Sequence, residues 1–94
     1  MKNLNFHHLF YFWQVAKSGH LTQAARNLHV SQSALSAQIR QLEAYLGGAL
    51  FDRTGRTLTL TDFGANVLAY ADGIFALGQE LMANVRAGEE KSLQ

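Results

Sequence analysis

The chain has 94 residues, of which 48% are hydrophobic and 11% aromatic, enough for one small folded domain and evidence against disorder. It contains no cysteine, which excludes disulfide bonds and thiolate metal sites and is compatible with a reducing cytoplasm. The longest strongly apolar run, residues 9–13, is far too short to span a bilayer. We therefore expect a soluble cytoplasmic protein with no membrane partner.

The formal net charge of +1 hides an asymmetry between the two parts of the chain. Residues 1–60 hold six basic and two acidic side chains (net +4), whereas residues 61–94 hold two basic and five acidic ones (net −3). A basic first part followed by an acidic second part indicates that only the first part meets a polyanion.

A first helix is predicted to run to about Lys17, with Asn3 or Asn5 as its N-cap. His7 and His8 stand in its first turn, but neighbouring residues point about 100° apart on a helix, so we expect no metal site there. Apolar side chains cover a wide arc of this helix, which should be largely buried. They are Phe6, Leu9, Phe10, Phe12, Trp13, Val15 and Ala16.

Two further helices are predicted after Gly19, which is suited to the left-handed position that ends the first helix. In residues 21–28 the apolar or small side chains share one face: Leu21, Ala24, Ala25 and Leu28. In residues 32–46 they again share one face: Leu35, Ile39, Leu42 and Leu46. Ser31 is a good N-cap for the later helix, whereas His20 is a weak one for the earlier helix, whose start could lie slightly later.

The opposite face of residues 32–46 carries small and amide side chains where an ordinary solvated helix would carry Lys and Glu. Such side chains allow close approach to another surface. They also match the groups that read DNA base edges. Gln pairs with adenine, Ser can bond to either a donor or an acceptor on a base, and Ala contacts a thymine methyl group. The alternative is an unremarkable surface helix of a small bundle. The residues concerned are Gln32, Ser33, Ser36, Ala37 and Arg40.

A small β-hairpin, or wing, is predicted for residues 49–60. The chain returns to the core at residues 49–51, turns around Gly55, and then alternates with period two so that Leu58 and Leu60 face inward. Arg53 and Arg56 flank the turn, a shape that can follow a phosphate backbone or enter a minor groove. The alternative is an ordinary solvated charged turn.

A last helix is predicted from Phe63 to about Arg86, with Thr61 as its N-cap and Asp62 in its first turn. The polar tail, residues 88–94, is expected to fray. The apolar stripe of the helix itself repeats every seven residues and is wider than a small domain could cover, which indicates a partner helix. The predicted dimer interface comprises Val67, Leu68, Ala71, Ile74, Phe75, Gly78, Leu81, Met82 and Val85.

In this order the segments resemble the N-terminal DNA-binding region of LysR-type transcriptional regulators over roughly residues 4–90. The resemblance is carried by AA–x2–L–HVSQ–x2–LS–xQIRQLE followed by LF–xRTGR–x3–LT–x2–G. The first helix, NFHHLFYFWQVAKSG, is similar to the subgroup that includes activators of sodium/proton antiporter genes. Ser33 stands where the family usually has proline, and Ala37 where it often has a long polar residue, which affects base preference rather than fold.

The resemblance implies a mainly α fold: a winged helix-turn-helix over residues 1–61 (three helices and a hairpin wing), then a linker and dimerisation helix over residues 62–90. It implies a homodimer that binds double-stranded DNA at an interrupted inverted repeat, with a tetramer possible at full length. The resemblance implies that the family's effector-binding domain is absent from this chain, and we expect a small-molecule effector to act only through that C-terminal domain. Major-groove contacts are expected from Ser31, Gln32, Ser33, Ser36, Ala37 and Arg40, and phosphate or wing contacts from Thr22, Gln23, Arg53 and Arg56.

Two other classes of protein compete with a DNA-binding regulator. A helical dimerisation or adaptor module that binds only protein would leave the wing arginines and the small-residue helix face without a purpose. An enzyme is not expected, because the sequence has no cysteine, no Gly-rich phosphate loop and no paired acids beside a base. His20 and His29 flank a turn without a plausible nucleophile partner, and we expect neither a cofactor nor a metal.

Overall fold

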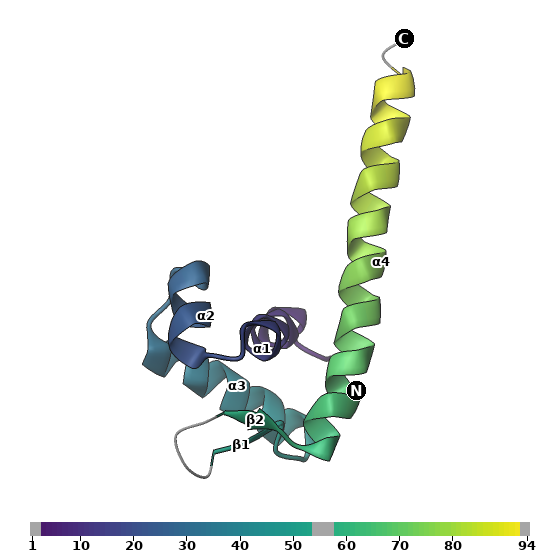
Figure 1. Cartoon of the computed structure of the whole chain (residues 1–94). Coiled ribbons are helices and arrows are strands. Elements are labelled where there is room, and N and C mark those ends of the chain that lie inside the picture. Colours follow the sequence, from purple (N-terminus) through teal and green to yellow (C-terminus); the bar gives the residue numbers. More distant parts are fainter. Residues whose placement is uncertain (1–2, 54–57, 93–94) are drawn as a thin grey trace.

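A computed structural model describes residues 3–53 and 58–92 of the chain. The first three helices and a short hairpin form a head, from which the last helix projects as a rod, and the molecule measures 57 × 32 × 21 Å (Figure 1). The fold is therefore mainly helical, as predicted. Its elements are α1 (Phe6–Ser18), α2 (Leu21–Leu28), α3 (Gln32–Leu46), β1 (Phe51–Asp52), β2 (Thr59–Leu60) and α4 (Asp62–Ser92).

The predicted helix ends of α1 are confirmed. Of the two candidate caps, Asn5 is the one used, since its side-chain oxygen accepts the backbone N–H groups of His7 at 3.0 Å and His8 at 3.1 Å. Gly19 adopts the left-handed conformation (φ 77°) and donates its N–H to the carbonyl of Val15. At the other predicted cap, Ser31 accepts the N–H of Ala34 at 3.1 Å and begins α3.

The core lies inside the head, where α1 packs against α2, α3 and α4. Phe6 was expected to be buried and is instead 58% exposed, because the buried face of α1 is centred on Leu9, Phe12 and Val15. Phe12 also meets Phe51 of β1, with 5.4 Å between ring centroids. The buried hydrophobic side chains are Leu9, Tyr11, Phe12, Val15, Ala24, Ala25, Leu35, Ile39, Leu42, Leu50, Phe51 and Ala71.

The hairpin is antiparallel, with Phe51 opposite Leu60 and Asp52 opposite Thr59. It is shorter than the predicted period-two segment. Leu58 and Leu60 are half-buried and pack against the core, as expected. The turn that carries Gly55 and Arg56 lies outside the described residues.

The junction between β2 and α4 is fixed by backbone contacts. The hydroxyl of Thr61 accepts the N–H of Gly64 at 2.9 Å, which confirms Thr61 as the N-cap, and it donates to the carbonyl of Ala49. The N–H of Thr61 bonds to the carbonyl of Leu50 at 3.1 Å. A Cβ atom at Gly64 would collide with that same carbonyl, so only glycine fits there.

The 31 residues of α4 exceed the predicted length, since the helix continues past Arg86 to Ser92 and residues 88–92 are helical rather than irregular. Glu and Lys are good helix formers, and a single glycine at position 88 costs only about 1 kcal/mol. Among the described residues, no helix combines the length and apolar character that a membrane span requires.

The expectation that one continuous stripe of α4 faces a partner needs correction. Ala71 is completely buried in the core of its own chain. Four more of the predicted interface residues pack partly against that core, because the first half of α4 lies along α1; they are Val67, Leu68, Ile74 and Phe75.

Candidate nucleic-acid interface

A tight turn sets α3 against α2. It contains His29 in the left-handed conformation (φ 58°, ψ 41°), with its N–H directed at the carbonyls at the end of α2. Histidine is among the residues that tolerate this region better than most. The helix α2 begins at Leu21 without a side-chain cap, since the side chain of His20 makes no capping hydrogen bond.

The two faces of α3 differ sharply in exposure. Leu35, Ile39 and Leu42 are buried, as their spacing predicts, and anchor the helix in the head. The outward face is accessible from its first turn onward. Of the residues predicted to read the major groove, Ser36 is half-buried and five are exposed: Ser31, Gln32, Ser33, Ala37 and Arg40.

Polar side chains of α2 and α3 meet at the start of α3. Gln32 donates from Nε2 to the hydroxyl of Thr22 at 3.0 Å, so two predicted site residues from different helices are in contact. This bond uses one of the two Gln32 amide N–H groups and leaves its carbonyl oxygen available. Gln23 donates to Asn27 at 3.2 Å. The contact with Asn27 was not predicted from the sequence, although two amide side chains four residues apart on a helix are a recognisable signal.

The face formed by α2 and the first turns of α3 carries no negatively charged side chain. No Asp or Glu precedes Glu43, so the exposed sides of α1, α2 and most of α3 carry only neutral or basic side chains. Arg26 and Arg40 are exposed, on α2 and α3 respectively. The N-termini of both helices add partial positive charge. The face can therefore approach a polyanion without like-charge repulsion.

The wing arginine described by the structure is tied to α3. Arg53 Nη1 lies 3.1 Å from Oε1 and 3.2 Å from Oε2 of Glu43, and the two side chains are 34% and 12% exposed. Glu43 also accepts the N–H of Leu50 at 2.7 Å. Spacing in the sequence gave no signal for this pair, because the partners are ten residues apart and belong to different elements. Arg56 lies outside the described residues.

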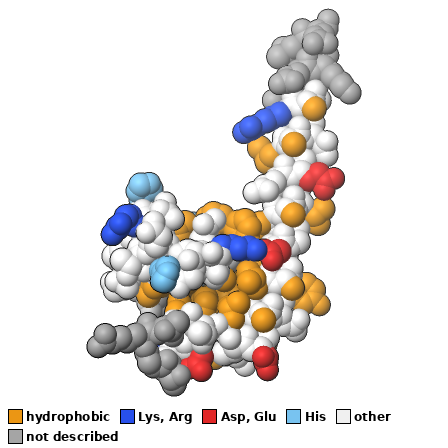
Figure 2. Space-filling view, viewed as in Figure 1, with side chains coloured by type: hydrophobic (Ala, Val, Ile, Leu, Met, Phe, Trp, Pro, Cys, Tyr) orange, Lys and Arg blue, Asp and Glu red, His pale blue; other side chains and the backbone are white. Residues whose placement is uncertain are grey.

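Where α4 leaves the head, it meets α1 at Asp72. One oxygen of Asp72 accepts the Trp13 indole N–H at 2.7 Å and lies 2.8 Å from the Lys17 ammonium. These hydrogen bonds, Lys17 first and then Trp13, hold the pKa of the Asp72 carboxyl below its ordinary value. Figure 2 shows hydrophobic side chains gathered where the head meets α4.

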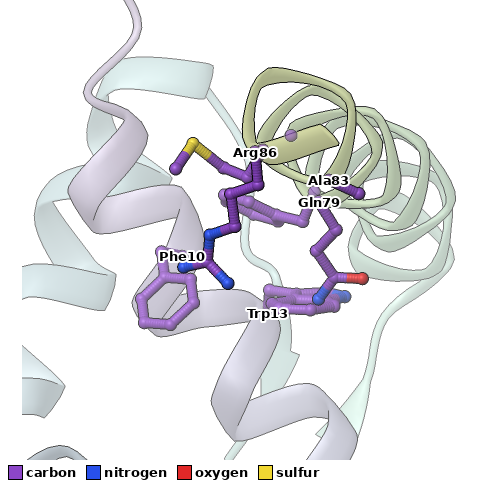
Figure 3. Close-up of a pocket in the computed structure, with 8 residues that line it drawn as sticks. Phe10, Trp13, Gln79, Ala83 and Arg86 are labelled. Atoms are coloured by element: carbon purple, nitrogen blue, oxygen red, sulfur yellow. The ribbon is translucent and has the colours of Figure 1, made fainter. Parts of the chain in front are cut away.

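Beyond this junction the two helices diverge and leave a cavity of about 440 Å³. Figure 3 shows Gln79 and Arg86 extending from α4 toward α1, where Phe10 and Trp13 lie. In addition to these four residues, the walls are formed by Phe75, Gly78, Met82 and Ala83.

A second apolar face of α4 contains two residues that were not predicted from the sequence, Tyr70 and Leu77. Tyr70 and Leu77 are 72% and 66% exposed, and Leu81, a predicted interface residue, is 61% exposed. With half-buried Ile74, these residues are spaced by four, three and four, the 3.5-residue repeat of a coiled-coil seam. We call Tyr70, Ile74, Leu77 and Leu81 the seam. The other predicted interface residues in this half of the helix, Gly78, Met82 and Val85, are also exposed.

Within the described ranges, no group of three or more His, Asp or Glu side chains is placed to hold a metal ion. A helix pair joined by a tight turn, an outward second helix and an adjoining hairpin together define the class of winged helix-turn-helix proteins. The sequence model described as bacterial regulatory helix-turn-helix protein, lysR family, matches residues 6–65. The chain belongs to the LysR family.

Curated relatives of this chain are transcriptional regulators. It is 41% identical over 93 residues to the transcriptional activator protein NhaR of Escherichia coli (strain K12), a match that covers 99% of this chain and 31% of NhaR. It is 44% identical over 70 residues to the RuBisCO operon transcriptional regulator of Allochromatium vinosum, covering 74% of this chain and 22% of that protein. The chain thus spans less than a third of the length of these relatives.

Solved structures of similar shape include DNA complexes. The BenM_DBD/catB site 1 DNA complex matches with a TM-score of 0.83 and 30% identity, over 88% of this chain and 92% of that one. Vibrio fischeri DarR in complex with DNA matches with a TM-score of 0.81 and 28% identity, over 92% of this chain and 30% of that one. The winged helix-turn-helix fold predicted from the sequence is confirmed.

Proposed function

We propose that this chain is the DNA-binding part of a bacterial transcriptional regulator and that it reads double-stranded DNA with α3 in the major groove. The observation that carries the proposal is the outward face of α3, which is exposed, free of acidic side chains over its first eleven residues and anchored from behind by buried leucine and isoleucine. DNA complexes of BenM_DBD and DarR support it. Its site of action would be the bacterial cytoplasm.

Within this proposal the residues divide into two roles. Base edges would be read by Ser31, Gln32, Ser33, Ser36, Ala37 and Arg40, and phosphates would be held by Thr22, Gln23, Arg53 and Arg56. The contact between Gln32 and Thr22 supports this division, because the phosphate-binding end of α2 would orient the amide that reads a base. A protein-only adaptor would leave this arrangement without a purpose.

A reader of two half-sites needs two recognition helices about 34 Å apart, or a multiple of that distance. We propose that a second copy of the chain packs along the seam of α4, in antiparallel orientation as the family resemblance implies. The exposure of the aromatic and leucine side chains of the seam supports this. Residues 1–61 would then act as the DNA-binding unit and residues 62–90 as the linker. A tetramer and a small-molecule effector would require the C-terminal domain that the resemblance implies.

The proposal is tested by selecting duplexes from a random library with the chain and then measuring affinities by fluorescence polarisation. Replacing Gln32 with Ala should cost about 1–3 kcal/mol on the selected duplex and little on a scrambled one. The matched control is Gln41→Ala, an exposed glutamine on the same helix about 13 Å further along its axis. Equal losses on both duplexes, or equal losses for both variants, would show that the N-terminal half of α3 does not read bases.

A further inference from the structure

Two side chains of α1 converge on a single oxygen of α4. Trp13 and Lys17 are four residues apart and so lie on the same side of α1. Both reach Oδ1 of Asp72, the indole N–H at 2.7 Å and the ammonium nitrogen at 2.8 Å. Hydrogen bonds to an ionised acceptor are shorter and stronger than neutral ones. We call Trp13, Lys17 and Asp72 the clamp.

The next turn of α4 holds the same tryptophan from a second side. Phe75 stacks on Trp13, with 4.8 Å between ring centroids and 30° between ring planes. Phe75 also packs edge-to-face with Phe10, with 5.5 Å between ring centroids. Because Asp72 and Phe75 are three residues apart, α1 grips two successive turns of α4. Such a grip fixes both the position of α4 and its rotation about its own axis.

The clamp lies near the last point at which the head holds α4. Every described side chain from residue 76 to residue 88 is exposed. From this junction onward the cavity separates α4 from α1, with Phe75 in its lining and Arg86 extending from α4 toward Phe10 (Figure 3). The direction in which the free half of α4 leaves the head is therefore decided at this junction.

We propose that the Trp13–Asp72–Lys17 clamp sets the separation of the DNA half-sites that the dimer accepts, and that its members are specificity-determining positioning residues that do not themselves touch DNA. The inference rests on the proposed function, because it needs two α3 helices joined through the seam. The seam residue Tyr70 lies two residues before Asp72, and Ile74 two residues after it. A change in the angle between the head and α4 therefore moves the two reading helices relative to each other.

The geometry of the DNA duplex makes half-site spacing depend on the angle between the head and α4. One additional base pair between half-sites shifts the second site by about 3.4 Å and rotates it by about 35° around the duplex. A junction held only by apolar contacts could adjust at low cost, since the hydrophobic effect is non-directional. A junction held by two charge-assisted hydrogen bonds cannot adjust without breaking them. The clamp therefore penalises displaced spacings.

The experiment compares wild type with Asp72→Asn, which removes the ion pair, and with Trp13→Phe, which keeps the apolar ring and removes the N–H donor. Glu80→Gln removes the same charge from an exposed position of α4 and is the control. Each protein selects duplexes from a random library. Dissociation constants are then measured on inverted repeats of the wild-type half-site with spacers shortened and lengthened by one and two base pairs, and on a single half-site.

We expect both clamp variants to select the wild-type half-site and to bind the single half-site as wild type does. Their discrimination between the preferred spacer and one displaced by two base pairs should fall about two- to fivefold, because the Lys17 and Asp72 side chains are 52% and 44% exposed and solvent weakens the interaction. Glu80→Gln should keep the wild-type profile. Trp13 is the only tryptophan of the chain, so in Asp72→Asn its fluorescence reports directly on a loosened junction.

Three outcomes would overturn the inference. An unchanged spacer profile in both clamp variants would show that the hydrophobic contacts suffice. Loss of single-half-site binding in both would show that the clamp is needed for the fold of the head. A wild-type chain that selects no repeated sequence would defeat the proposed function and the inference with it, whereas the first two outcomes defeat the inference alone.

Discussion

Glu43 of α3 and Arg53 of the wing form an ion pair that joins the proposed reading helix to the proposed phosphate-binding arm. The carboxylate lies 3.1 Å from Arg53 Nη1 and is only 12% exposed. It also accepts the N–H groups of Leu50 at 2.7 Å and Phe51 at 3.4 Å. The wing is thus fixed to α3 by one side chain that serves three donors.

The first prediction concerns this side chain. Glu43→Ala leaves the N–H of buried Leu50 without its partner and should destabilise the fold by about 1–3 kcal/mol. Glu80→Ala, an exposed glutamate on α4, should change stability by less than about 0.5 kcal/mol. Urea unfolding followed by circular dichroism measures both. Equal stabilities of the two variants would show that Glu43 is not a structural tie.

The second prediction is the salt dependence of DNA binding. Neutralising phosphates releases counterions, so log K should fall by about 0.9 per cationic contact for each unit of log[salt]. With three or four contacts per protomer, a dimer should show a slope of roughly −5 to −7. Arg53→Ala should weaken binding to the selected and scrambled duplexes nearly equally if Arg53 contacts phosphate. A slope near zero would be incompatible with the proposed interface.

The third prediction tests the reading face at Ala37. Its methyl group can touch a thymine methyl but cannot form a hydrogen bond, so this position should discriminate weakly. Ala37→Arg should raise non-specific affinity and shift preference toward guanine at one base pair per half-site. Ala44→Arg, at an exposed alanine further along α3, should raise affinity without changing the selected sequence. If selection returns the wild-type motif for Ala37→Arg, residue 37 does not face the groove.

The fourth prediction concerns dimerisation. Leu81→Asp places a charge in the seam and should cost several kcal/mol of association. Ala76→Asp adds the same charge on the opposite side of α4 and should leave association unchanged. Phe75→Asp is unsuitable, because Phe75 packs on Trp13 and Phe10 of its own head. Sedimentation at tens of micromolar decides the matter, and a monomeric wild type that still binds a full inverted repeat tightly would show that DNA assembles the pair.

The fifth prediction is a pH dependence at Asp72, whose pKa is lowered by its hydrogen bonds with Lys17 and Trp13. Because the folded-state pKa lies below the unfolded one, the stabilisation is complete above the unfolded value of about 4 and is lost as pH falls through the folded value. The difference in Tm between wild type and Asp72→Asn should be constant above about pH 5 and shrink below about pH 4. A difference that persists unchanged in acid would mean that the carboxylate charge contributes nothing.

The features predicted well from the sequence are those encoded within a few residues. The spacing of Leu35, Ile39 and Leu42 specifies the buried face of α3, and Ser31 and Gly19 mark helix ends through local backbone bonding. Such signals depend on the 3.6-residue period and on capping, so they can be read without knowing the fold.

The contacts that the sequence did not predict join distant segments. Trp13 and Asp72 are 59 residues apart, and neither position is unusual for its own helix. The division of the apolar side chains of α4 between its own head and an exposed seam depends on how α4 crosses α1. The heptad columns indicated an excess of apolar surface but could not show which part of it α1 would cover.

The contact of Gly64 with the Leu50 carbonyl makes the base of α4 and the wing one mechanical piece. The clamp ties the head to the same helix at Asp72, so the head and the first part of α4 turn together. Beyond the clamp, residues 76–92 form an arm about 26 Å long. A rotation of about 6° at the junction therefore displaces the far end of α4 by about 3 Å, which is the length of one hydrogen bond.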